Sequence, residues 1–223
     1  MLQVITRYFS ICFMTMTFLN VFTIVNVTHS STQKGGPKSA KIGKQVWMAE
    51  NLNVETFRNG DRIYYAKNRQ DWELAITEER PAWCYYNDDP NNAAKYGKLY
   101  NWHAVKDPRG LAPKGWHIPT KDEFDVLSNM NTMGFVNTLK SKTGWNEDYG
   151  GNNKTGFAAV AGGYRVGHGF GDFYYAGEGG WWWSSSENPE GGAAWYFTLQ
   201  YNETMGGEEF GFDMGLSIRC IKD

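Results

Sequence analysis

The sequence predicts an α+β fold of short mixed or antiparallel sheets, a few short helices and long glycine-rich loops. The chain has 10 tryptophans and 26 glycines among its 223 residues, a composition that suits short strands and tight turns better than a helical bundle. Residues 194–201 alternate as a half-buried strand does. Thr120-Lys121-Asp122-Glu123 has the spacing of a capping box, which begins a helix.

The first thirty residues have the pattern of an export signal. They contain one charged side chain, Arg7, followed by a long apolar run. Thr28-His29-Ser30 then places small residues three and one positions before a cleavage point. An uncleaved membrane anchor is the alternative, because about 20 apolar residues are just long enough to cross a bilayer. We predict a signal peptide over 1–30, a polar leader over 31–41, and one mature domain over 42–223 that is secreted, periplasmic or held at the cell surface.

The charge balance argues against a nucleic-acid partner. The formal net charge is −2 and becomes −3 when Arg7 leaves with the signal. The mature domain therefore has no basic excess with which to neutralise phosphates. We expect a membrane as a partner only if the N-terminal segment remains as an anchor.

Two cysteines, Cys84 and Cys220, remain after cleavage of the signal. An exported protein meets an oxidising compartment in which disulfides persist. We predict that the two cysteines pair, closing a long loop for which the chain-entropy model gives on the order of 4–5 kcal/mol. The alternative is two buried free thiols.

The first half of the mature domain is predicted to alternate short strands with one short helix. Gly43 to Glu50 is predicted to be a strand, and Asn59-Gly60 is typical of a tight hairpin turn. Asp71 to Glu79 is predicted to form a helix that Pro81 ends. A strand is expected over Ala82 to Tyr86.

The second half begins with the clearest helix, which we expect to run from the capping box to about Met130 with an apolar stripe toward the core. Residues 144–180 are predicted to be mostly loop because they are rich in glycine. The strand over 194–201 should place Trp195, Phe197, Leu199 and Tyr201 on one face, and Ala194, Tyr196, Thr198 and Gln200 on the other, polar face. The segment 215–222 should turn Leu216, Ile218 and Cys220 inward and join the C-terminus to a sheet.

Several separate blocks of the sequence form a recognisable series. They are Gly43 to Leu52, Gly97 to Trp102, Gly115 to Thr120, Leu139-Lys140-Ser141, Gly150-Gly151-Asn152 to Gly156-Phe157, Gly162-Gly163-Tyr164-Arg165, Trp182-Trp183-Ser184-Ser185 and Ser217-Ile218-Arg219-Cys220. Together, and in this order, they resemble the Fibrobacter succinogenes major paralogous domain over residues 42–223.

The resemblance implies a secreted or surface-attached domain, found mainly in Bacteroidetes, with a C-type-lectin-like fold. Such a fold presents ligands on the loops and strands of its second half, although a fold alone does not establish a function. Calcium-dependent sugar lectins use a Glu-Pro-Asn or Gln-Pro-Asp loop, whereas Glu187-Asn188-Pro189 has a different order. Neither Asp88-Asp89 nor Glu208-Glu209 has the spacing of a calcium loop. We therefore expect no metal site.

Candidate ligand-binding residues centre on Trp181-Trp182-Trp183. Alternate side chains of a strand face opposite ways, so Trp182 cannot share a face with both neighbours, and we expect at least one indole to be exposed. An exposed indole suits stacking on a sugar ring or anchoring a protein interface. The alternative is that all three tryptophans fill the core. The polar candidates beside them are Ser185, Glu187 and Asn188, and the second-rank aromatic candidates are Tyr174-Tyr175 and Tyr196.

We expect no catalysis and no cofactor. His103, His117 and His168 lack the helical spacing of a zinc site, and the serine run lacks a Gly-x-Ser-x-Gly elbow. Formylglycine-generating oxidases share a lectin-like fold and end in a strand similar to Ile218-Arg219-Cys220. They depend on a reactive cysteine pair with copper, however, so this enzyme class is the lowest alternative.

The leading hypothesis is an exported extracellular or cell-surface recognition domain. Its ligand surface would comprise the loops of Gly162–Glu187 and the strand Trp195–Tyr201, and its ligand would be a carbohydrate or a protein. The alternative is a structural or adhesive surface subunit with a flat, extended contact patch.

Overall fold

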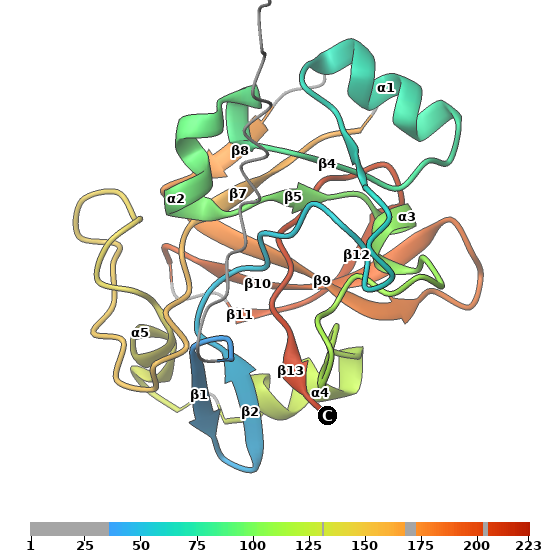
Figure 1. Cartoon of the computed structure of the whole chain (residues 1–223). Coiled ribbons are helices and arrows are strands. Elements are labelled where there is room, and N and C mark those ends of the chain that lie inside the picture. The colour runs from blue at the N-terminus through green and yellow to red at the C-terminus, as the bar shows by residue number, and fades with distance from the viewer. Residues whose placement is uncertain (1–35, 131, 168–172, 203–204) are drawn as a thin grey trace, which may run out of the picture. The chain divides into compact units, whose positions relative to one another are not determined.

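The computed structural model describes residues 36–130, 132–167, 173–202 and 205–223, and these residues form three β-sheets with short helices between them (Figure 1). This arrangement confirms the α+β class. The predicted signal peptide lies outside the described residues. Within the described ranges, no helix is long and apolar enough to span a membrane. The helices are α1 (Arg69–Thr77), α2 (Ala93–Tyr96), α3 (Trp102–Val105), α4 (Lys121–Ser128) and α5 (Phe135–Leu139), with 3-10 turns η1 (Tyr86–Asp88) and η2 (Pro90–Asn92).

The largest sheet is mixed and has the strand order β11-β10-β9-β7-β8, with β12 pairing on β10. Strands β9 and β10 are antiparallel, while β7 runs parallel to β9 and antiparallel to β8. The strands are β7 (Gly162–Arg165), β8 (Phe173–Ala176), β9 (Gly179–Glu187), β10 (Ala193–Gln200), β11 (Met205–Gly206) and β12 (Glu209–Gly211).

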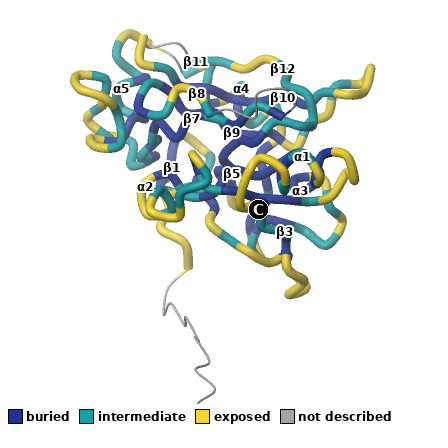
Figure 2. Tube along the Cα trace, turned by 90° about the horizontal axis from the view of Figure 1, so that it is seen from above, coloured by how far each residue is buried: buried dark blue, intermediate teal, exposed yellow. Residues whose placement is uncertain are grey.

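Strands β9 and β10 are buried on both faces, as the dark colour along them indicates (Figure 2). Strand β10 confirms the strand predicted over 194–201. The expectation that one of its faces is polar is wrong, because Tyr196 and Thr198 are also buried. The cause is that the sheet separates two hydrophobic clusters, one containing Trp183 and Tyr196 and the other containing Trp182 and Phe197.

The second sheet joins the two ends of the domain in the order β1-β2-β13-β6. The single strand predicted over 43–50 is in fact a hairpin, with a turn at Gly43 and Lys44. The predicted C-terminal strand is regular only over its last residues, although β13 does pair with β2 and β6 as expected. Both alternating sets of 216–220 are buried, so Ser217 and Arg219 also lie inside. The strands are β1 (Ser39–Ile42), β2 (Gln45–Met48), β6 (Trp116–His117) and β13 (Ile221–Lys222).

The third sheet has the order β3-β4-β5, with β3 (Tyr64–Tyr65), β4 (Ala82–Cys84) and β5 (Leu99–Tyr100). The helix predicted from Asp71 is α1, which begins two residues earlier because the Asn68 side chain accepts a hydrogen bond from the backbone N–H of Asp71. The strand predicted over 82–86 ends at Cys84, where the chain continues into η1.

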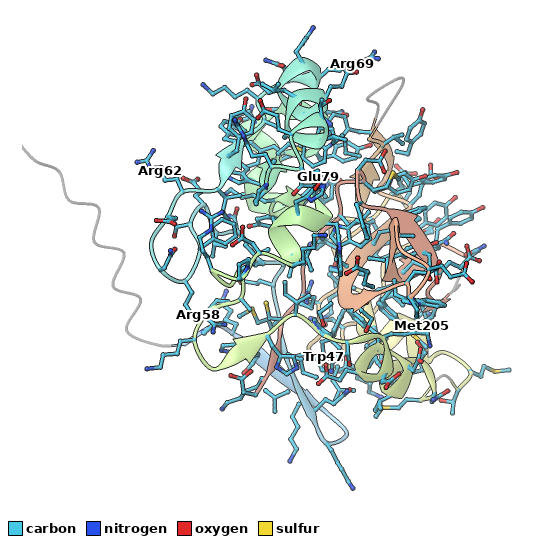
Figure 3. The ribbon with its side chains drawn as sticks, turned by 90° about the vertical axis from the view of Figure 1, so that its right-hand side faces the viewer. Trp47, Arg58, Arg62, Arg69, Glu79 and Met205 are labelled. Carbon is cyan, nitrogen blue, oxygen red and sulfur yellow. The ribbon has the colours of Figure 1, made fainter. Side chains whose placement is uncertain are left out.

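Helix α4 packs against the underside of the large sheet. The predicted capping box is present, with the Thr120 and Glu123 side chains each bonding a backbone N–H. The Phe124 ring stacks on Phe197 of β10 at 4.7 Å and 4°, and its centroid lies 5.2 Å from that of Trp47. Trp47, on β2, is labelled in Figure 3. These contacts form the core between the hairpin, the helix and the sheet.

The predicted disulfide is absent, because Cys84 and Cys220 are both free thiols. Cys84 lies in a hydrophobic cluster with Trp72, and Cys220 lies in a different cluster with Trp183. Both side chains are fully buried. Burial raises the pKa of each thiol to about 12, so each behaves as a small apolar core residue.

Candidate functional site

The three consecutive tryptophans of β9 are all buried, with exposed fractions of 5%, 0% and 0% for Trp181, Trp182 and Trp183. The expectation that at least one indole is exposed is therefore wrong. Strand alternation holds, since Trp181 and Trp183 belong to one cluster and Trp182 to the other. The indole N–H of Trp182 donates to Asn51 Oδ1 at 2.8 Å, and that of Trp183 donates to the Tyr100 carbonyl at 2.9 Å. The indole N–H groups of both residues are thus hydrogen-bonded to other groups of the domain.

Aromatic rings do reach the surface beside Trp181, and we call this cluster the aromatic face. Tyr174 and Tyr175 are its most exposed members, at 41% and 50%. It is built by five strands of the large sheet, β7 to β10 and β12. Its members are Tyr164, Tyr174, Tyr175, Trp181, Tyr196 and Phe210.

Tyr164 is the centre of the aromatic face. Its ring centroid lies 6.0 Å from that of Tyr174, 5.8 Å from Tyr175 and 5.0 Å from Trp181. Phe210 lies 5.4 Å from Tyr164 and stacks on Tyr196 at 4.3 Å. The rings are therefore continuous from β8 to β12. Trp181 forms a buried support under the exposed tyrosines.

The backbone at Tyr175 breaks the alternation of β8. Neighbouring residues of a regular strand point to opposite faces. Tyr175 instead has φ = 63°, a left-handed conformation that costs a non-glycine residue roughly 1–2 kcal/mol. Its ring lies 5.4 Å from Trp181, so Tyr174 and Tyr175 both adjoin the Tyr164 cluster. Residues strained in this way cluster at functional sites. Tyr175 is one of seven non-glycine residues with positive φ in the described ranges, and the one that lies in the aromatic face.

Polar groups adjoin the aromatic face at β12 and at the end of β9. Of the predicted polar candidates, Ser185 and Glu187 are exposed and Asn188 is half-buried. The Asn188 amide donates a hydrogen bond to the Glu209 carboxylate, next to Phe210 in the chain. Burial and the nearby charge of Glu208 raise the pKa of Tyr196 to about 12. Tyr196 therefore remains a neutral phenol at physiological pH.

Of the predicted candidates, the aromatic face brings together Tyr174, Tyr175, Trp181 and Tyr196. Trp182 and Trp183 lie in the core, with their indole N–H groups bonded internally. Tyr164 and Phe210 were missed by the sequence analysis. The Gly162-Gly163-Tyr164-Arg165 block was the available signal for Tyr164, whereas nothing in the local pattern distinguishes Phe210 from a core residue.

A cleft of about 780 Å³ forms a second surface feature. Its walls come from the chain after β2, from α2 and the turn that follows, and from the loops between α5 and β7. Asn51 and Arg219 are at its base. The Arg219 guanidinium donates to Asn51 Oδ1 at 2.6 Å, to the Met48 carbonyl at 3.1 Å and to the Phe157 carbonyl. Because these partners are all inside the domain, the base of the cleft is a structural network.

Across residues 36–130, 132–167, 173–202 and 205–223, no group of three or more His, Cys, Asp or Glu side chains is placed to hold a metal ion. His117 bridges Asp223 and the capping-box Glu123, each at 2.9 Å. His168 lies outside the described residues.

One comparison with known proteins gives a match. The family model of the Fibrobacter succinogenes major domain matches residues 40–222, nearly the whole span expected from the sequence blocks. The comparisons with curated proteins and with solved structures find no match.

Proposed function

The chain belongs to the Fibrobacter succinogenes major domain family, and we propose that its domain is an exported recognition domain that binds a carbohydrate outside the cytoplasm through the aromatic face. The sequence pattern of residues 1–30, which predicts an export signal, supports the location. We propose a C-type-lectin-like arrangement for the fold, because the domain ends are joined in one sheet and the candidate surface lies in the second half of the chain.

The single observation that carries the proposal is the pair of exposed rings at Tyr174 and Tyr175. A flat ring offers an apolar surface to the C–H face of a sugar, while the phenol hydroxyl offers a hydrogen bond at its edge. Two adjacent rings on a rigid sheet lose little conformational entropy on binding. The strained backbone of Tyr175 places the second ring there at a cost to stability.

The first test is a glycan array, followed by calorimetry of the best ligand with the purified protein. The double variant Tyr174→Ala/Tyr175→Ala is expected to weaken binding at least about tenfold, which corresponds to about 1.4 kcal/mol. The matched variant Tyr174→Phe/Tyr175→Phe retains both rings and should keep affinity within a few fold. Val126→Ala, at an exposed position of α4, should leave binding unchanged.

Unaltered binding by the double alanine variant would reject the aromatic face as the site. If no glycan binds, the carbohydrate proposal fails. A protein partner captured through the same two tyrosines would then support the adhesive-subunit alternative.

A further inference from the structure

The charge distribution of the second half of the chain constrains the ligand of the aromatic face. No lysine or arginine occurs between Val166 and Ile218. This segment supplies β8 to β12, and hence five of the six rings of the aromatic face. The same segment contains eight acidic residues: Asp172, Glu178, Glu187, Glu190, Glu203, Glu208, Glu209 and Asp213.

Two of the described acidic residues, Glu208 and Glu209, immediately precede Phe210 at the start of β12, and we call this edge the rim of the aromatic face. Glu208 is exposed, and its carbonyl accepts the backbone N–H of Tyr196 at 3.0 Å. Glu187 and Glu190 are exposed at the β9–β10 turn. Glu209 accepts a hydrogen bond from Asn188. The rings are thus uncharged, and solvated carboxylates lie beside them.

The nearest cations are not placed to neutralise a ligand over the rings. Arg165 is fully buried, where it pairs with Asp88 at 2.6 Å and lies over the rings of Trp72 and Phe173. Lys121 lies over the Trp195 ring and pairs with Asp125 at 2.5 Å. Trp195 and Tyr196 are neighbours on β10, so their side chains point to opposite faces of the sheet.

Lys106 is exposed and lies 4.9 Å from the Phe212 ring centroid. Phe212 stacks on Trp102 and is not a member of the aromatic face. The Lys106 ammonium thus lies over Phe212 and not over a ring of the aromatic face. An acidic ligand would accordingly meet carboxylates without a counter-charge over the rings.

We infer that the ligand is an uncharged glycan, and that uronic, sulfated and sialylated glycans are excluded; this inference rests on the proposed function. Like charges placed across an interface suppress the wrong partner, whereas solvated rim charges add little affinity of their own. A neutral sugar avoids that repulsion. Its C–H face covers the rings, and its hydroxyl groups stay in water at the rim.

The test compares uncharged, acidic and amino glycans on one array with the purified protein. The strongest saturable ligands should be uncharged and should be lost in the Tyr174→Ala/Tyr175→Ala variant. Their Kd should change less than about twofold between about 0.05 and 0.5 M NaCl, because salt screens charge interactions and leaves stacking nearly unaffected. If the protein preferred acidic or amino glycans, and this binding were also lost in the Tyr174→Ala/Tyr175→Ala variant, the inference of an uncharged ligand would be overturned while the proposed function would stand. Failure to bind any glycan would reject the proposed function as well.

Glu208 provides a matched pair of variants. Glu208→Gln should leave the Kd for the uncharged glycan within about twofold, because the side chain is exposed at the rim. Glu208→Lys should add measurable binding of acidic glycans that the wild type rejects. A loss of about tenfold or more in Glu208→Gln would show that the ligand depends on the negative charge, and would overturn the inference.

Discussion

Replacing Trp182 by alanine is expected to lower the free energy of unfolding by about 3–5 kcal/mol. The side chain is completely buried and lies 6.2 Å from the Phe157 ring and 6.1 Å from the Phe197 ring. Its removal leaves a cavity between the large sheet and the second sheet. It also removes the donor of the hydrogen bond to Asn51.

Urea unfolding followed by circular dichroism measures this effect. Trp195→Ala is the control, because Trp195 is only half-buried on the neighbouring strand and should cost much less. If Trp182→Ala unfolded within about 1 kcal/mol of the wild type, the placement of this indole in the core would be wrong.

Asn51→Ala should destabilise the domain by about 3 kcal/mol, since hydrogen bonds to a charged group contribute about 1.5–3 kcal/mol and two buried donors lose their acceptor. Asn51 Oδ1 accepts from Arg219 Nη2 at 2.6 Å and from the Trp182 indole at 2.8 Å. Its amide also donates to the Tyr96 carbonyl at 2.9 Å. One side chain therefore connects the loop after β2 to β9, to α2 and to the C-terminal segment.

Asn91→Ala is the matched control for this prediction. Asn91 lines the same cleft but is exposed, and within the described part of the chain its side chain bonds only to Asp89. Its loss should therefore cost less than about 0.5 kcal/mol. A double-mutant cycle sharpens the test. Trp182→Phe should cost less in the Asn51→Ala background than in the wild type, because the bond is already absent there. If the destabilisation by Trp182→Phe and by Asn51→Ala were simply additive, the hydrogen bond between Trp182 and Asn51 would contribute nothing to stability, and the proposed network would be contradicted.

The sequence predicted the elements whose signals are local. The capping box at Thr120 and Glu123 begins α4 because two short-range hydrogen bonds determine it. The alternation of 194–201 predicted β10 because a strand needs no distant partner to show its period. The opposite orientations of Trp182 and its neighbours follow from the same period.

Properties that depend on the rest of the fold were not predictable in the same way. Alternation shows which residues share a face but not whether that face is covered, so the burial of all three tryptophans was not foreseen. Cysteine pairing depends on which cluster encloses each thiol, and the two thiols lie in different clusters. Tyr164 and Phe210 are far apart in the sequence, and they meet because β12 pairs with β10 in the same sheet as β7.

The Tyr175→Gly variant tests most directly whether the aromatic face exists for binding. Glycine accepts the left-handed backbone of this position without strain, and the lost ring is half exposed. We predict a thermal midpoint equal to or above that of the wild type, together with at least about tenfold weaker binding of the glycan selected by the wild type. A variant that binds the glycan as tightly as the wild type, or that unfolds at a clearly lower temperature, would contradict the account and make Tyr175 a structural residue.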